Sequence, residues 1–339
     1  MTRKVSSIEH RRPFSIRDHN VSRVDSAIDE ACKFWKIPGA VVTIADISGG
    51  RYIKCYGVKN LEDGSPVDAN TVFAIASLTK AFTAAVSTIV MRENLNVLDS
   101  PVRTYFPQFR LSELSADHLV TIRDLLTHRV GLARNDMLWY DSPFDAQEVL
   151  KRVQFLPFVN GFRSIYNYNN LMFLAAGLAI GTRANANWHE LVRTHLFEKL
   201  DMARTSTSLN DVVAAGNYAT PYQLGGDGQV HELQWRDLSN IAPAGAINSC
   251  GLDIANWLQC LLQGGIFNGT EIVTPEALAT TFTPQVVIPF VGATKQLNPF
   301  AVQMSYGLGW GINDFFGLRM VTHDGAIDGF RSRIAICLT

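Results

Sequence analysis

The chain has 339 residues, of which 47% are hydrophobic and 18% charged, so it is long and apolar enough to bury a large core and to divide into two lobes. Its 30 basic and 31 acidic residues leave a formal net charge of -1 without clusters of like charge, which excludes a nucleic-acid partner and binding to an anionic membrane. The histidines, cysteines and acidic residues show no metal-ligand spacing, so we expect no metal and no cofactor.

The first predicted elements are a helix and a hairpin. Residues 1–20 form a polar leader without the apolar core of a secretory signal, so we expect a cytoplasmic protein, and no apolar stretch is long enough to cross a bilayer. Apolar side chains at helical spacing over Val21–Trp35 predict an amphipathic helix that lies on a sheet. Gly39–Ala45 and Arg51–Tyr56 are typical of strands, and the glycine pair beginning at Gly49 predicts a tight turn between them.

Helical periodicity dominates the middle of the chain, and strand patterns return near its end. Helices are predicted at Ala81–Arg92, Ile122–Thr127, Ala146–Val153, Leu171–Ile180 and Trp188–Leu200. Strands are predicted at Ser305–Ile312, Leu318–Thr322 and Arg331–Leu338. We therefore predict an α+β fold with a mostly antiparallel sheet, built from both chain ends and flanked by helices, plus an inserted all-α lobe. The sheet lobe comprises residues 21–76 and 235–339, and the mainly helical lobe comprises residues 77–234.

Ser77 and Lys80 are candidate catalytic residues because they open a predicted helix one turn apart. Positions i and i+3 share a helix face with Cβ atoms about 5–6 Å apart, so the Lys80 amine can reach the Ser77 hydroxyl. A serine hydroxyl needs a neighbouring base at neutral pH, and a buried lysine can act as one. The helix N-terminus also favours negative charge on an attacked carbonyl oxygen. The alternative is a helix-capping serine followed by a solvated lysine.

A resemblance to a known family supports the catalytic interpretation. The stretch Phe73–Thr83 resembles the first motif of the class C β-lactamase and serine esterase family, and Tyr168–Asn170 resembles its second motif, Y-x-N. The resemblance implies a β-lactamase/transpeptidase-like fold in which Ser77 is the acylated nucleophile. It also implies that Lys80 and the tyrosine of the second motif handle the nucleophile's proton.

The second motif leaves two assignments to decide. Tyr168 serves as a base near neutral pH only if a cation such as Lys80 stabilises its phenolate. Asn170 is implied to donate its amide to the substrate carbonyl or to orient Lys80. Tyr166 is a competing tyrosine, but choosing it would put Tyr168 at the asparagine position. We therefore assign the role to Tyr168.

His323, Asp324 and Gly325 resemble the third family motif in its esterase form, H-x-G. The resemblance implies a strand that lines the cleft, with His323 and Gly325 at the substrate. It also implies that the N–H groups of Ala326 and Ser77 form the oxyanion hole. The K-T-G form of the motif has a lysine at the position of His323. Without that permanent cation, the carboxylate of a β-lactam or a D-Ala peptide is anchored less well.

The implied function is a serine hydrolase that acts through an acyl-enzyme on a small-molecule ester, lactone or amide. Three alternatives stay open: an acyltransferase that uses the same acyl-enzyme, a β-lactamase or D-amino-acid peptidase, and a non-catalytic scaffold with this fold. Members of the family continue beyond Phe330 with further strands and a helix that covers a sheet face. We therefore expect an exposed sheet face here, and three explanations stay open: a truncated form, a natural short form, or a face covered by a second subunit of a homo-oligomer.

Overall fold

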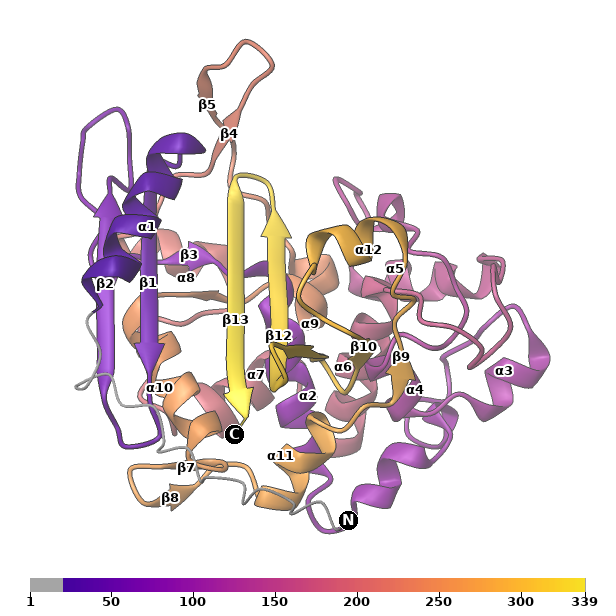
Figure 1. Cartoon of the computed structure of the whole chain (residues 1–339). Coiled ribbons are helices and arrows are strands. Elements are labelled where there is room, and N and C mark those ends of the chain that lie inside the picture. The colour runs from indigo at the N-terminus through magenta and orange to yellow at the C-terminus, as the bar shows by residue number, and fades with distance from the viewer. Residues whose placement is uncertain (1–20, 339) are drawn as a thin grey trace, which may run out of the picture.

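The computed structural model describes residues 21–338. The polar leader predicted at residues 1–20 lies outside the described residues. Within residues 21–338, no helix is both long enough and apolar enough to cross a membrane. The fold combines helices with antiparallel sheet, as predicted, and Figure 1 shows the strands of both chain ends beside a region of helices from the middle of the chain.

The chain opens with one helix and two antiparallel strands: α1 (Ser22–Phe34), β1 (Gly39–Ala45) and β2 (Arg51–Gly57). These elements confirm the predicted helix and hairpin. Gly49 in the turn has φ +88°, a conformation that favours glycine. The Asp25 carboxylate of α1 accepts hydrogen bonds from the hydroxyls of Tyr52 (2.5 Å) and Tyr56 (3.1 Å) of β2. The helix is thereby attached to the hairpin.

The C-terminal strands form an antiparallel sheet of order β13-β12-β11-β10-β9: β9 (Val286–Val287), β10 (Met304–Tyr306), β11 (Gly311–Phe315), β12 (Leu318–Ile327) and β13 (Phe330–Leu338). β12 is longer than predicted, because it continues through His323. The single strand predicted at Ser305–Ile312 is wrong, because the chain turns between β10 and β11. Gly309 in that turn has φ +73°, and a Cβ on it would lie 2.5 Å from the Lys80 carbonyl oxygen.

The β1–β2 hairpin is not hydrogen-bonded to the five-stranded sheet, so the prediction that both chain ends build one sheet is wrong. In Figure 1, β1 and β13 run side by side in the same direction, and both line one cavity. The N–H of Val58 donates to the carbonyl oxygen of Pro38, and the N–H of Asp46 donates to that of Gly50. These two bonds show which residues of β1 direct their backbone groups towards β2, since hydrogen-bonded and non-hydrogen-bonded pairs alternate along the ladder. That alternation turns one set of β1 backbone groups away from β2: those of Gly39, Val41, Thr43 and Ala45.

The middle of the chain is helical, as predicted, with small shifts at the helix ends. Its elements are η2 (Ala76–Leu78), α2 (Thr79–Val90), η3 (Leu95–Asp99), η4 (Val102–Thr104), α3 (Leu114–Leu119), α4 (Ile122–Leu126), η5 (Asp136–Leu138), α5 (Ala146–Arg152), η6 (Val153–Phe155), α6 (Asn170–Ala184), α7 (Trp188–Val192), η7 (Arg193–Phe197) and α8 (Leu209–Ala215). The helix predicted at Trp188–Leu200 is α7 followed by a π-helical turn, η7. The side chain of Asn169 caps α6 by accepting the N–H of Met172 (3.2 Å).

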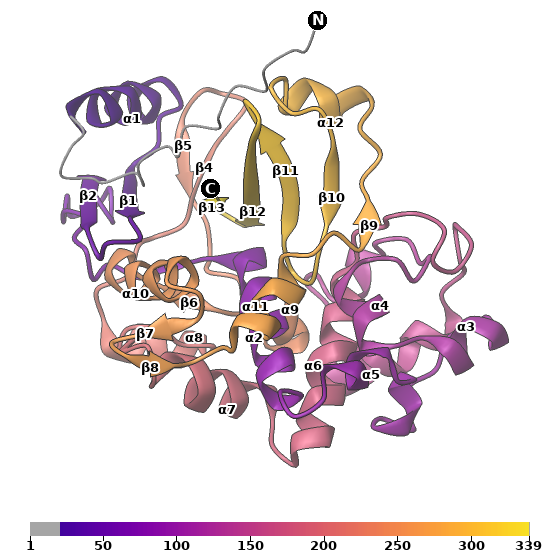
Figure 2. The ribbon, with the colours of Figure 1, turned by 60° about the horizontal axis from the view of Figure 1, so that its bottom comes forward.

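Short strands and further helices complete the fold: β3 (Phe73–Ala74), β4 (Tyr222–Leu224), β5 (Val230–Glu232), η8 (Ser239–Ile241), α9 (Ala242–Gly245), β6 (Asn248–Ser249), α10 (Gly251–Leu262), β7 (Ile266–Phe267), β8 (Thr270–Glu271), α11 (Pro275–Thr281) and α12 (Gly292–Leu297). Figure 2 shows α1 and α10 on opposite sides of the hairpin. α10 packs closely on β1, where a Cβ on Gly251 would lie 2.4 Å from Cγ2 of Val41.

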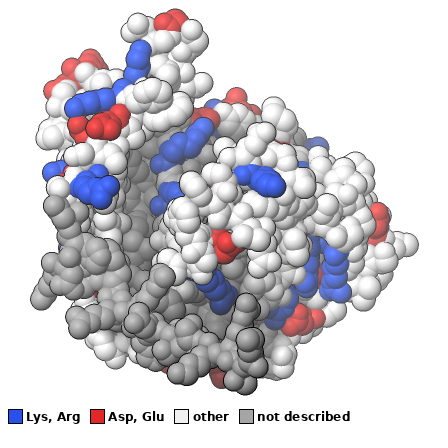
Figure 3. Space-filling view, viewed as in Figure 1, with Lys and Arg blue, Asp and Glu red and all other residues white. Residues whose placement is uncertain are grey.

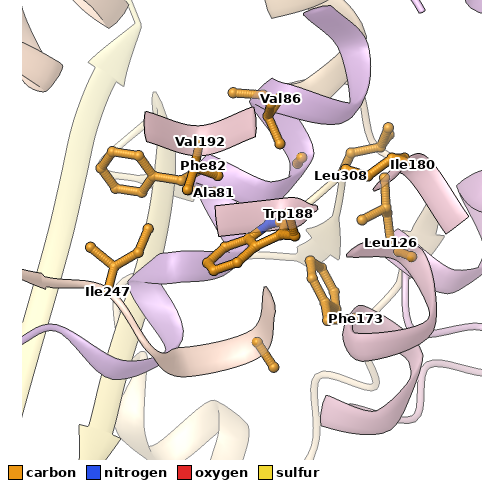
Figure 4. Packing of buried hydrophobic residues seen from close by; sticks show 14 of the residues in the cluster. Ala81, Phe82, Val86, Leu126, Phe173, Ile180, Trp188, Val192, Ile247 and Leu308 are labelled. Atoms are coloured by element: carbon orange, nitrogen blue, oxygen red, sulfur yellow. The ribbon is translucent and has the colours of Figure 1, made fainter. Parts of the chain in front are cut away.

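A continuous hydrophobic core surrounds α2, and Figure 4 shows part of it. The rings of Phe82 and Trp257 are stacked with centroids 4.7 Å apart, which joins α2 to α10. Trp188 is buried among apolar side chains and donates its indole N–H to the hydroxyl of Thr83 (3.1 Å). Because this core includes residues of both predicted lobes, the division at residues 76/77 and 234/235 stays a prediction.

Candidate active site

Ser77 lies where the short strand β3 leads into η2 and α2. Just before it, the N–H of Ile75 donates to the carbonyl oxygen of Ile247 (3.1 Å), and β3 pairs with β6. Ala76 has φ +48°, a left-handed conformation that is uncommon for a residue with a Cβ. Strain of this kind often marks functional sites, and here it adjoins the candidate nucleophile. These backbone constraints hold Ser77 partly exposed in the main cavity.

Lys80 is completely buried one helical turn after Ser77. Its Nζ lies 3.0 Å from the Ser77 hydroxyl and 2.8 Å from the carbonyl oxygen of Ala244 in α9. Burial lowers the pKa of Lys80 well below its usual range, and the charge of Arg134 acts in the same direction. The site therefore favours a neutral amine that can accept the proton of Ser77.

Tyr168 lies on the other side of the Ser77 hydroxyl and donates a hydrogen bond to it at 2.7 Å. Burial raises the pKa of Tyr168, so this environment favours the protonated phenol. It does not favour the expected phenolate stabilised by Lys80. The competing Tyr166 instead packs its ring against His128 and Tyr306. The structure thus brings Ser77, Lys80 and Tyr168 together.

His323 on β12 is buried, and both of its ring nitrogens are engaged within the protein. Nδ1 lies 2.8 Å from the carbonyl oxygen of Asp324, which can only accept, and Nε2 lies 2.9 Å from the hydroxyl of Tyr306. We therefore assign the proton to Nδ1 and a donated hydrogen bond from Tyr306 to Nε2. Burial lowers the pKa of His323 to about 3, with a contribution from Lys80. His323 is thus a neutral residue without a free nitrogen for a substrate.

Gly325 and Ala326 follow on β12 with different surroundings. A Cβ on Gly325 would lie 2.2 Å from both the carbonyl oxygen of Ile75 and the hydroxyl of Ser332. The glycine therefore lets β12 approach the segment before Ser77, and substrate approach at Gly325 stays a prediction. Ile327 and Phe330 close the β12–β13 hairpin, so antiparallel alternation points the N–H of Ala326 away from β13. This direction agrees with the oxyanion-hole prediction.

Asn170 begins α6, lines the same cavity as Ser77 and donates its side-chain amide to Asp136 (2.9 Å). Sequence reasoning missed Asp136 and its neighbour Arg134, whose guanidinium lies 5.0 Å from the ring centroid of Tyr168. It also missed Tyr306. A polar loop between helices was the only sequence signal for Asp136, because its partner lies 34 residues away.

The cavity that contains Ser77 has a volume of about 1480 Å³ and extends to the space between β1 and β13. Figure 3 shows basic and acidic side chains interspersed over the face that it views. Among residues 21–338, no group of three or more His, Cys, Asp or Glu side chains could hold a metal ion.

Comparison with known proteins gives a match over most of the chain. The family model described as Beta-lactamase matches residues 26–338. "Unguisins hydrolase ungD" of Aspergillus violaceofuscus is 31% identical over 335 residues, which cover 91% of this chain and 57% of that protein. The chain therefore spans little more than half the length of this curated relative.

Solved structures show the same fold. The octameric penicillin-binding protein homologue from Pyrococcus abyssi superposes with a TM-score of 0.80 at 22% identity, covering 94% of this chain and 71% of that one. The D-stereospecific amidohydrolase from a Streptomyces species superposes with a TM-score of 0.74 at 19% identity, covering 94% of this chain and 91% of that one. At these identities, the likeness concerns the fold.

Proposed function

The chain belongs to the β-lactamase family, and from this premise we propose that it is a serine hydrolase that forms and hydrolyses an acyl-enzyme on Ser77. One observation carries the proposal: the Ser77 hydroxyl lies between the Lys80 amine at 3.0 Å and the Tyr168 hydroxyl at 2.7 Å. A nucleophile, a base and a second proton carrier are thus in contact, as covalent catalysis requires.

The first half of the proposed reaction acylates Ser77. Its Oγ attacks the substrate carbonyl carbon while its proton passes to the neutral amine of Lys80. The N–H groups of Ser77 and Ala326 stabilise the oxyanion. As the tetrahedral intermediate collapses, Tyr168 gives its proton to the leaving alcohol or amine and regains one from Lys80. Ser77 now carries the acyl group, and its hydroxyl proton has left, by way of Lys80 and Tyr168, on the departing alcohol or amine.

The second half releases the acyl group with water. The neutral amine of Lys80 accepts a proton from the attacking water molecule, and the ester bond to Ser77 breaks as Tyr168 donates its proton to Oγ and regains one from Lys80. The Lys80 amine keeps its hydrogen bond to the carbonyl of Ala244 in both halves, which holds Nζ in place. The same two groups therefore serve both steps.

The proposed substrates are carboxylic esters, lactones or amides. The engaged nitrogens of His323 support this class over substrates anchored by a carboxylate at that position, because a neutral, fully bonded imidazole offers no cation. The names of two similar proteins, a hydrolase and an amidohydrolase, are compatible with this class.

Hydrolysis of p-nitrophenyl butyrate by the purified chain and by its Ser77→Ala variant tests the proposal. We expect the variant to lose about 10³-fold or more of kcat/KM, because the nucleophile is absent. Ser87→Ala is the matched control, since Ser87 lies on the same helix, buried, with its hydroxyl bonded to the carbonyl of Thr83. We expect this control to retain activity within a few-fold.

Labelling with a fluorophosphonate separates the possible failures. If the folded protein is labelled at Ser77 but does not cleave the ester, Ser77 is the nucleophile, and the natural substrate carries another acyl group or the acyl group passes to another acceptor. A folded protein that is neither labelled nor active contradicts the proposed function and supports the scaffold alternative.

A further inference from the structure

Two side chains of α2, one helical turn apart, hold two consecutive carbonyl groups of α9. Nζ of Lys80 lies 2.8 Å from the carbonyl oxygen of Ala244, and the hydroxyl of Thr83 donates a hydrogen bond to the carbonyl oxygen of Pro243 at 2.7 Å. Both side chains are completely buried. The place of α9 relative to α2 therefore determines where the amine of Lys80 is held.

The hydroxyl of Thr83 has a fixed direction. The indole N–H of Trp188, at the start of α7, donates a hydrogen bond to it at 3.1 Å. An indole N–H can only donate and a backbone carbonyl can only accept, so the Thr83 hydroxyl accepts from Trp188 and directs its own proton to Pro243. These three groups thus form one buried chain of hydrogen bonds that ends on α9.

α9 contacts both α2 and α6, and the contact with α6 limits its movement. A Cβ on Gly177 of α6 would lie 2.2 Å from Cγ of Pro243 and 3.3 Å from Cδ1 of Trp188. The glycine therefore lets α6 pack directly against both side chains. Because α9 is hydrogen-bonded to α2 and closely packed against α6, it has little room to shift.

The carbonyl of Ala244 sets the direction of the Lys80 lone pair. A neutral amine has two N–H groups and one lone pair, and one N–H of Nζ donates to Ala244. Because Tyr168 donates to the Ser77 hydroxyl, that hydroxyl directs its own proton to the lone pair of Nζ. A shift of the Ala244 carbonyl would turn Nζ and move the lone pair away from the proton that it must accept.

We propose that Thr83 and Trp188 are positioning residues for Lys80 that act through α9. This inference rests on the proposed function, in which Lys80 is the base, and adds two residues that do not line the described cavity of Ser77. Thr83 holds α9 and with it the Ala244 carbonyl, and Trp188 fixes the direction of the Thr83 hydroxyl. Because Lys80 takes a proton in both halves of the proposed reaction, loss of this positioning lowers kcat and leaves KM nearly unchanged.

The informative variant is Thr83→Val, which removes the hydroxyl and keeps nearly the same shape. We expect its kcat for p-nitrophenyl butyrate and its rate of labelling by a fluorophosphonate to fall about tenfold, with KM within about twofold of the wild type. Thr83→Ser keeps the hydroxyl and should stay within about threefold of the wild type. Thr88→Val is the matched control and should keep the wild-type kcat, because Thr88 is buried on the same helix with its hydroxyl bonded to the carbonyl of Ala85 at 2.8 Å.

Trp188→Phe tests the far end of the chain of hydrogen bonds. It keeps a ring in the core and removes the N–H, so the Thr83 hydroxyl can turn and kcat should fall about threefold. Because the two side chains act in one chain, Trp188→Phe combined with Thr83→Val should have the kcat of Thr83→Val alone. All rates are divided by the number of sites that the fluorophosphonate labels at completion, so unfolded protein does not count.

Three results would overturn the inference and leave the proposed function intact. They are a kcat of Thr83→Val equal to that of Thr88→Val, a loss that Thr83→Ser does not recover, and single losses that multiply in the double variant. If Thr83→Val does not fold, an unchanged kcat in Trp188→Phe overturns the inference, and a fall in its kcat at unchanged KM supports it.

Failure of the proposed function gives a different result. If folded wild type is neither labelled nor active, Ser77 is not the nucleophile, and the inference fails with the proposed function. If wild type is labelled at Ser77 without cleaving the ester, the labelling rates of the same variants decide, because Lys80 activates Ser77 in that reaction too.

Discussion

The side chain of Lys80 has no solvent exposure, and burial holds its amine pKa well below the usual range. In the unfolded chain the same amine has an ordinary pKa near 10.4, so unfolding takes up a proton at pH values between the folded and the unfolded pKa. Stability is then lost as pH falls below the unfolded pKa. Lys80 therefore destabilises the fold at neutral pH, which is understandable if it is retained for catalysis.

The variant Lys80→Met should separate stability from activity. We expect an increase of about 0.5–2 kcal/mol in the free energy of unfolding at pH 7, measured by urea denaturation, and loss of ester hydrolysis. The gain should shrink as pH rises towards that of the unfolded amine. Lys199→Met, at an exposed position, is the control and should change neither quantity appreciably. A Lys80→Met protein that is less stable at every pH contradicts the cost assigned to burial.

His323 gives a second prediction at the residue scale, which concerns stability at acidic pH. Burial lowers its pKa to about 3, whereas an unfolded histidine titrates near 6.5, so protons bind preferentially to the unfolded chain between these values. Stability should fall with decreasing pH by at most about 1.4 kcal/mol per pH unit from this group. We expect His323→Gln to remove about 2 kcal/mol of the loss between pH 6 and pH 4. Urea denaturation over that range measures it, with exposed His118→Gln as control.

At the scale of elements, the sequence pattern predicted the helices and turns that depend on residues close together in the chain. The helix predicted at Ala81–Arg92 became α2, and the glycine turn of the first hairpin was correct, because periodicity and turn chemistry act within a few residues. The turn at Gly309 was missed, because its glycine is required by the Lys80 carbonyl more than two hundred residues away. Such contacts leave no local pattern.

The residues of the candidate site also divide into those that a local sequence pattern predicts and those that it does not. Ser77 and Lys80 could be predicted because their spacing on a helix brings them together. Tyr168 required the family resemblance. Asp136 had no signal beyond a polar loop, and Tyr306 had none, because their roles depend on contacts with Asn170 and His323 that only the folded chain makes.

The open edge of β1 gives a prediction about two adjacent valines. Val41 and Val42 are both half-buried on β1. By the alternation of the ladder, the N–H of Val42 bonds to β2, whereas the N–H of Val41 faces the open edge. Proline lacks an N–H, so Val42→Pro should be less stable than Val41→Pro by about 1–3 kcal/mol in urea denaturation. Equal losses would mean that the edge beside β13 is paired in solution.

At the scale of the whole molecule, a polar cluster joins the two sides of the cleft. The hydroxyl of Tyr140 lies 2.8 and 2.9 Å from the two carboxylate oxygens of Asp328, in the turn between β12 and β13. Nε of Arg236 donates to the same carboxylate at 2.9 Å, and its guanidinium lies 4.7 Å from the centroid of the Tyr140 ring. The hydrogen bond to Asp328 raises the pKa of Tyr140, so its proton stays available for this contact.

Removal of this hydroxyl should loosen the cleft without touching Ser77. Tyr140→Phe keeps the ring beside Arg236 but loses a hydrogen bond to a charged acceptor, which contributes about 1.5–3 kcal/mol where it is buried and less in this half-buried position. We expect faster amide hydrogen exchange in the loop of residues 131–141 and a higher KM, with kcat changed less. The loop that contains Asp136 would then be less well ordered before substrate binds. Unchanged exchange in this loop, with unchanged KM, would show that the core around α2 alone holds the two sides of the cleft together.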